Sequence, residues 1–187
     1  LLIGVSLLLM VVLLGALNRT LHGVIIPLCI GAWPTLIMVG VMGWVGQSLG
    51  FINQVTLVLI PVIALADSLH MLSRYHEELA GKAAWDGSIS RADQEQAIVI
   101  SLKNVGPACF FTSLTTVFGF LSLTATRLSV LGAFGRMAGF GVVIAFVGTI
   151  LWMPLLLLLV KDPVVTNPKH GNSGALHKVL RAINRLT

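Results

Sequence analysis

The sequence predicts an all-α membrane protein with five transmembrane helices and a C-terminal amphipathic helix in the cytoplasm. Two observations carry this prediction. Of the 187 residues, 56% are hydrophobic and only 10% are charged, whereas a soluble domain carries about 25% charged residues. The uncharged segments are also long enough to cross a bilayer as helices, which takes about 20 residues each. The net charge of +5 therefore reports membrane topology and not a surface for nucleic acid.

The predicted spans follow one another through short turns, except for one long hydrophilic loop. The chain begins inside an apolar run, so we expect a piece of a longer protein whose first span is cut short at its start. Pro27 and Pro34 fall in the second span, where proline is expected to kink the helix. A transmembrane domain over residues 1–160 would comprise spans at about 1–17, 23–45, 52–73, 107–124 and 132–160, with a loop at 74–106.

The loop at 74–106 and the tail at 161–187 are each expected to contain an amphipathic helix. In the loop, Ser90 and Asp93 match a capping box at a helix start. The residues that follow on one helical face favour a short helix on the membrane surface; they are Ala97, Ile98, Ser101, Leu102 and Val105. In the tail, a linker precedes a basic amphipathic helix at 175–187, which would lie on an anionic leaflet or dock on a partner domain.

The 12 Lys and Arg residues predict how the chain is oriented. With five alternating spans, all of them except Arg127 and Arg136 fall on the same side of the membrane. Cytoplasmic loops carry an excess of Lys and Arg, so that side should be the cytoplasm. We therefore expect a protein of the inner or plasma membrane, with the loop at 74–106 and the C-terminal tail in the cytoplasm.

Asp67 is the only acidic residue inside a predicted span. A charged side chain at membrane depth costs about 2.5–3.5 kcal/mol on insertion scales, and an acid in this position points by default to a function. A titratable acid on a helix that can shift is the minimum device for proton-coupled transport. Alternatively, Asp67 only pairs with a neighbouring helix and fixes the packing.

Several polar residues could form a proton relay with Asp67. His70 lies one helical turn further on and could pass protons to the carboxyl group or hold it by a hydrogen bond, or it could simply be packed. In the fourth span, Thr112, Thr115 and Thr116 share a helical face. Their hydroxyl groups could bond to Asp67 from a facing helix, or bond back to carbonyl groups of their own helix.

The sequence contains no catalytic triad, nucleotide-binding loop or metal cluster, so we expect neither an enzyme nor a cofactor. Zinc is not expected at His70 because no second ligand lies at a matching spacing. The small residues of the segment 135–139, together with Gly141 and Gly148, are typical of close helix packing.

Three segments of the chain carry a resemblance to a known family. They are LIPVIALADSLHMLSRYHEE at 59–78, GPACFFTSLTTVFGFLSL at 106–123 and LGAFGRMAG at 131–139. Together they resemble the RND superfamily of transporters, and within it the MMPL family of exporters of lipids or other hydrophobic compounds. The resemblance implies that the five spans are helices two to six of one RND-type repeat, the unit that also forms the sterol-sensing domain of the Patched and Niemann–Pick type C proteins. It also implies that Asp67 is the family's proton-relay aspartate.

The resemblance further implies parts that lie outside this chain. A large extracytoplasmic porter domain would precede Leu1 and a second repeat would follow Thr187, with the basic tail helix joining the two halves. Membrane lipids and a hydrophobic or lipid substrate would be its partners, and assembly into a homo-oligomer is left open. Many relatives have glycine and tyrosine where this chain has Ile63 and Ser68, so the hydrogen bond to Asp67 would have to come from Ser68, Thr112 or Thr116.

The leading hypothesis is thus the membrane half of a proton-driven exporter of lipids or other hydrophobic compounds. Two alternatives stay open. The first is a sterol- or lipid-sensing module that binds lipid without pumping. The second is an accessory subunit of the Sec translocation system, which shares the fold and a mid-membrane aspartate, although His70 and the segment 112–120 fit the exporter branch better.

Overall fold

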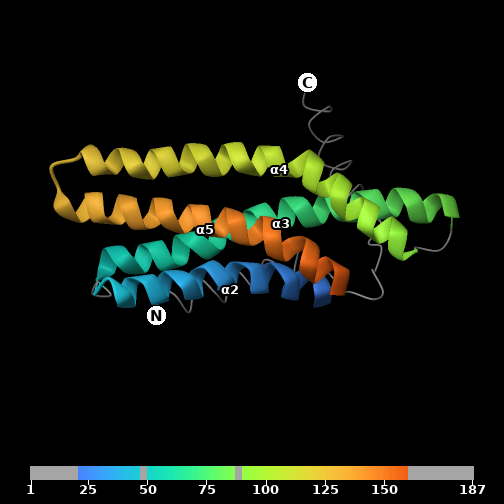
Figure 1. The fold of residues 1–187 in the computed structure, drawn as a ribbon, viewed down its shortest axis with the longest axis horizontal. Coiled ribbons are helices and arrows are strands. Elements are labelled where there is room, and N and C mark those ends of the chain that lie inside the picture. Colours follow the sequence, from blue (N-terminus) through green and yellow to red (C-terminus); the bar gives the residue numbers. More distant parts are fainter. Residues whose placement is uncertain (1–20, 47–49, 87–89, 160–187) are drawn as a thin grey trace, which may run out of the picture.

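The computed structural model describes residues 21–46, 50–86 and 90–159. These residues form long α-helices and no strand. The elements are α2 (Leu21–Trp44), α3 (Phe51–Asp86), α4 (Arg91–Ser122), the short 3₁₀ helix η1 (Leu123–Ala125) and α5 (Ser129–Leu159). The long helices lie side by side along one axis and alternate in direction (Figure 1). The predicted all-α class is confirmed for this part of the chain, whereas the predicted span at 1–17 and the tail at 161–187 lie outside the described residues.

Each of the four long helices is long and apolar enough to cross a membrane. The candidate spans are Gly23–Trp44, Asn53–Lys82, Arg91–Ala125 and Ser129–Leu159. They overlap the second to fifth spans predicted from the sequence. The chain is therefore a multi-pass membrane protein.

Helices α3 and α4 both extend well into the stretch at 74–106 that the sequence analysis assigned to a loop. The charged residues there support a helix because they pair along it. The Arg74 guanidinium group bonds to the carboxylates of Glu77 at 2.9 Å and Glu78 at 2.6 Å, at the helical spacings of three and four residues. Only a short connection between Asp86 and Arg91 separates the two helices.

The capping box at the start of α4 is present as predicted. The Ser90 hydroxyl accepts the Asp93 N–H at 3.2 Å, and the Asp93 carboxylate accepts the Ser90 N–H at 3.2 Å. The predicted face of this helix is buried at Ala97 and Ile98. However, the helix is not a separate surface helix, because α4 continues without a break into the predicted fourth span.

Proline explains why α4 can continue and yet bend. Pro107 lies inside the helix and has no N–H for the carbonyl group of Lys103. Proline bends a helix at such a position without necessarily ending it, and α4 changes direction along its length (Figure 1).

Glycines allow α5 to approach its neighbours closely. A Cβ atom at Gly141 would lie 2.5 Å from a methyl carbon of Ile60 on α3 and 3.3 Å from the sulfur of Met38 on α2. A Cβ atom at Gly135 would overlap the backbone carbonyl oxygen of Phe120 on α4. The small-residue seam of α5 therefore serves close packing.

Candidate functional site

Asp67 lies near the middle of α3 and is buried, with 7% of its surface exposed. Ala64, one turn earlier, is completely buried and adds little bulk beside the carboxyl group. The Oδ2 atom of Asp67 is buried and has no hydrogen-bond partner among the described residues. Burial of a polar atom without a partner costs free energy. The structure thus places an acid with an open bonding position inside the helix bundle.

Two polar side chains of α4 lie next to Asp67. Cys109 and Ser113 are both buried and close enough to interact with its carboxyl group. They are four residues apart, so they share one face of the helix. The Ser113 hydroxyl, like Asp67 Oδ2, completes no hydrogen bond among the described residues.

Asp67 and Ser113 therefore lie next to each other without a hydrogen bond between them. A serine hydroxyl can both donate and accept, a carboxylate only accepts, and a protonated carboxyl group donates through its O–H. A small movement of α3 against α4 would let Ser113 bond to either protonation state of Asp67.

The predicted neighbours of Asp67 on its own helix are placed differently from each other. Ser68 is completely buried, but its hydroxyl donates to the Leu65 carbonyl oxygen at 2.8 Å. His70 is exposed on the surface of the bundle and interacts electrostatically with Asp67. In this arrangement Ser68 does not supply the missing partner, while His70 lies between Asp67 and the charged end of α3.

The predicted threonine hydroxyls of α4 bond to their own helix. Thr112 donates to the Cys109 carbonyl oxygen at 3.0 Å, and Thr115 and Thr116 donate to that of Thr112 at 2.9 Å and 2.7 Å. Thr112 and Thr115 are also exposed. Of the two alternatives that the sequence left open, the structure shows the back-bonded one.

Cys109 and Ser113 were not among the site residues predicted from the sequence. Their spacing of four residues was visible, but four hydroxyls occur close together in the segment 112–116 and the threonines drew the prediction. Choosing Ser113 requires knowing which face of α4 turns toward α3.

A second buried polar group joins three helices near the charged end of the bundle. The Gln94 side-chain amide donates to the Leu157 carbonyl oxygen at 2.8 Å, which connects α4 to the last turn of α5. The last carbonyl groups of a helix lack N–H partners within it, so Gln94 satisfies one of them. The buried Tyr75 hydroxyl of α3 lies beside Gln94. The bond from Gln94 to Leu157 connects α4 to α5, and this cluster is outside the Asp67 site.

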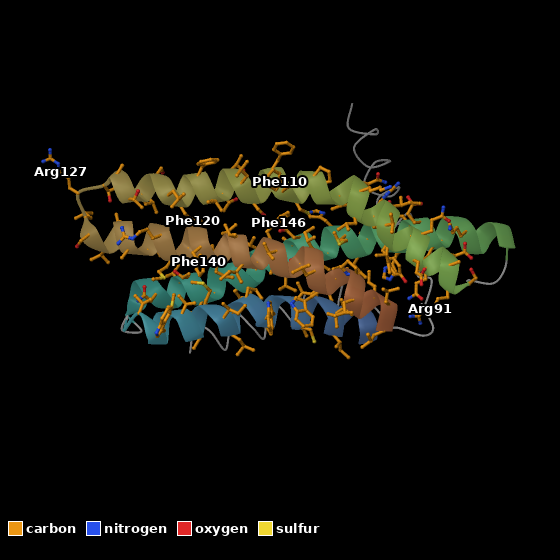
Figure 2. The ribbon with its side chains drawn as sticks, viewed as in Figure 1. Arg91, Phe110, Phe120, Arg127, Phe140 and Phe146 are labelled. Atoms are coloured by element: carbon orange, nitrogen blue, oxygen red, sulfur yellow. The ribbon has the colours of Figure 1, made fainter. Side chains whose placement is uncertain are left out.

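Charges gather at the ends of the helices. Arg91 and Arg127 mark opposite ends of α4 and the turn that follows it (Figure 2). Lys82 on α3 pairs with Asp93 on α4 at 3.0 Å, at the same end as Arg91. Within residues 21–46, 50–86 and 90–159, no group of three His, Cys, Asp or Glu side chains could hold a metal ion.

Comparisons with known proteins agree with the sequence resemblance. The model of the MMPL family matches residues 1–186. The sulfolipid-1 exporter MmpL8 of Mycobacterium tuberculosis (strain ATCC 25618 / H37Rv) is 26% identical over 125 residues, which cover 65% of this chain and 10% of the exporter. The probable transport protein MmpL10 of Mycobacterium leprae (strain TN) is 27% identical over 126 residues, which cover 66% of this chain and 12% of that protein. The match thus spans about a tenth of the length of these relatives. No solved structure matches the chain significantly.

Proposed function

The chain belongs to the MMPL family, and from this premise we propose that it forms part of the membrane domain of a proton-driven exporter of lipids or other hydrophobic compounds. Asp67 is the residue that takes up and releases the proton. The single observation that carries the proposal is the buried Asp67 carboxyl group. Its Oδ2 atom has no hydrogen-bond partner in the described part of the chain, and neither has the Ser113 hydroxyl that lies beside it.

Protonation of Asp67 would change the forces between α3 and α4. A charged carboxylate in a spanning helix calls for donors around it, whereas the neutral acid tolerates apolar neighbours. Pro61 lies inside α3 less than two turns before Asp67, and the helix lacks one backbone hydrogen bond there. α3 therefore has a place at which it can bend when the carboxyl group changes state.

The proton would reach Asp67 from the Arg74 end of α3. Positions 67, 70 and 74 lie on one stripe of the helix, and exposed His70 stands between the buried acid and Arg74. Four more hydroxyl groups could join this relay only by rotating away from the carbonyl groups that they now bind. They belong to Ser68, Thr112, Thr115 and Thr116.

The excess of Lys and Arg at the Arg74 end supports a cytoplasmic position for that end. Cysteine introduced at Arg91 should then react with a membrane-impermeant thiol reagent only from the cytoplasmic side. Cysteine at Arg127 should react only from the opposite side, in a background in which Cys29 and Cys109 are serine. The reverse pattern would contradict this orientation.

The rest of the transporter lies beyond this chain, because the relatives are about ten times longer than the match. We assign proton coupling to this chain and the choice of substrate to the remainder, which would include a second repeat and a porter domain. MmpL8 bears the name of a sulfolipid exporter, which supports a lipid as the class of substrate here.

The test is export by the full-length protein reconstituted in vesicles with an imposed pH gradient. Asp67→Asn keeps the shape of the side chain and removes its titration, so the variant should insert normally and lose gradient-driven export. Glu95→Gln is the matched control, because Glu95 is an exposed carboxylate of α4, and it should export as the unmodified protein does. Full export by Asp67→Asn would refute the proposal. Lipid binding without any effect of the gradient or of an uncoupler would favour a lipid-sensing module instead.

A further inference from the structure

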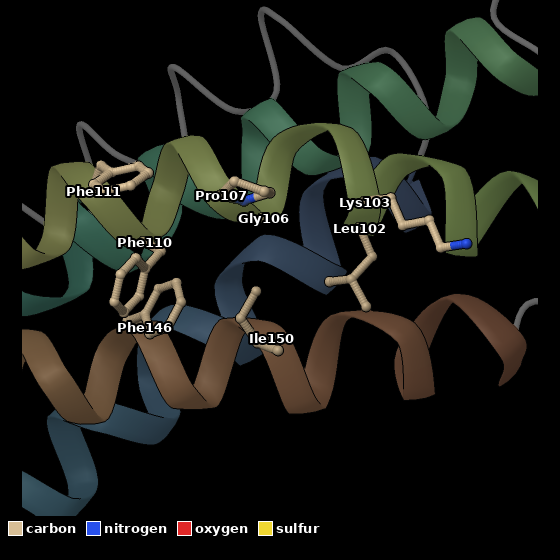
Figure 3. A pocket seen from close by; sticks show the side chains of 8 residues that line it. All are labelled: Leu102, Lys103, Gly106, Pro107, Phe110, Phe111, Phe146 and Ile150. Carbon is tan, nitrogen blue, oxygen red and sulfur yellow. The ribbon is translucent and has the colours of Figure 1, made fainter.

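An open groove of about 540 Å³ lies between α4 and α5, and Asp67 is not among its lining residues. Its walls are almost entirely apolar, with Leu102 on α4 and Ile150 on α5 facing each other across it (Figure 3). Both helices are candidate membrane spans. The groove therefore opens at membrane depth along the side of the bundle, where an apolar chain can enter it.

One end of the groove carries an unpaired cation. Lys103 lines it, is exposed, and makes no ion pair or hydrogen bond with its side chain among the described residues. It is also the last charged residue of α4, since none follows before Arg127. Lys103 thus stands where the polar end of the helix meets its apolar part, the level at which a lipid headgroup lies.

The other end of the groove is lined by aromatic rings. Phe110 on α4 and Phe146 on α5 lie with ring centroids 5.8 Å apart, and Phe111 lies 5.6 Å from Phe110. Figure 3 shows these rings together at the end away from the Lys103 ammonium group. The groove therefore has a cation at one end and aromatic rings at the other.

The depth of the groove comes from two residues between these ends. Gly106 has no side chain, and a Cβ atom added there would meet no atom within 4 Å. Pro107 bends α4 at the same place. The open space is thus a consequence of the backbone of α4.

We propose that this groove binds one acyl chain of an anionic membrane lipid, whose headgroup pairs with the Lys103 ammonium group. The groove runs from Lys103 to Phe110, about 10 Å at the rise of a helix, so it takes the part of the chain next to the headgroup. This binding does not require proton coupling at Asp67, and either proposal can fail without the other.

The charge contribution sets the size of the expected effect. A Lys near an anionic headgroup contributes about 1 kcal/mol to lipid binding, so its removal should weaken binding of an anionic lipid about fivefold. Binding of a zwitterionic lipid with the same acyl chains should change little.

The experiment uses the full-length protein in phosphatidylcholine nanodiscs that contain phosphatidylglycerol with a photoactivatable acyl chain. Irradiation should crosslink the probe to Phe110, Phe146 or Ile150, read by mass spectrometry. Lys103→Gln should lower this yield about fivefold at subsaturating probe, and Arg91→Gln, which removes an exposed cation of the same helix, should not. A photoactivatable phosphatidylcholine should label these residues less, and Lys103→Gln should not change its crosslinking yield.

A second pair of variants tests the groove itself. Gly106→Leu should fill it and abolish the crosslinks, whereas Gly119→Leu, at another glycine of α4 with open space around it, should keep them. Asp67→Asn should also keep them. Equal labelling by both lipids, or labelling that survives Gly106→Leu in a protein that melts normally, would overturn the proposal. So would an absence of crosslinks at the groove in the unmodified protein.

Discussion

Helices α3 and α4 are neighbours, yet they differ in how much of each helix the bundle buries. In the most apolar window of α3, 56% of the residues are buried inside the bundle, against 11% for α4. α3 buries Asp67 and Ser68, while α4 exposes Thr112 and Thr115. The exposed threonines satisfy themselves by bonding to their own helix. A carboxylate has no hydrogen to donate to a carbonyl group of its own helix, so Asp67 has no such local solution.

The difference between α3 and α4 depends on how α4 packs against the other helices. Among the glycines of α5, Gly135 leaves the least room between its own backbone and that of a neighbouring helix. A Cβ atom there would lie against the Phe120 carbonyl group of α4. This contact leaves no room for a side chain between α5 and the C-terminal part of α4.

Gly135→Ala should therefore have the largest effect on stability. The new methyl group would overlap a backbone oxygen that cannot rotate away, so α4 must move, at a cost of about 1–3 kcal/mol. Gly119→Ala is the matched control, because its methyl group would meet no atom within 4 Å. That change should be neutral or stabilise by up to about 1 kcal/mol, since alanine is the better helix former.

The measurement is unfolding of the full-length protein in detergent, followed by loss of helical signal with denaturant. Gly135→Ala should shift the midpoint to lower denaturant, and the export rate should fall with it because α4 is displaced from α5. Equal midpoints for the two variants would show that α4 does not depend on this contact.

The all-α class and an acid at membrane depth could be predicted from the sequence, because both follow from the pattern of apolar and charged residues. A charged residue inside an apolar segment is rare and visible without a structure. The lengths of α3 and α4 were not predictable in the same way, since hydropathy reports where a membrane ends and not where a helix ends. Arg74 and Glu78 pair along α3, past the predicted end of the span at residue 73, and Leu79 is still buried there.

The position of Ser113 could not be predicted for a different reason. Thr112, Ser113 and Thr115 are equally polar, and only the way α4 packs against α3, a contact between two helices, buries Ser113 and exposes the other two. Periodicity within one helix carries no information about that contact. Local patterns therefore found the acid but not its neighbour.

The smallest effects on stability are expected for substitutions at Ser113 and Thr115. Thr115→Val removes an exposed hydroxyl that bonds only to its own helix, so stability should change by less than about 0.5 kcal/mol and export should be normal. Ser113→Ala removes a buried hydroxyl that makes no hydrogen bond to any residue in the described ranges. Its loss should also leave stability unchanged, or raise it slightly, because no bond is broken and a buried polar group disappears.

The two variants should nevertheless differ in the pH profile of export. Ser113 lies beside the carboxyl group that we propose to titrate, so Ser113→Ala should displace the pH midpoint of gradient-driven export while Thr115→Val leaves it in place. A profile that neither variant moves would mean that α4 does not sense the protonation of Asp67. The buried and the exposed hydroxyl would then be equivalent, and the contrast between α3 and α4 would be one of packing alone.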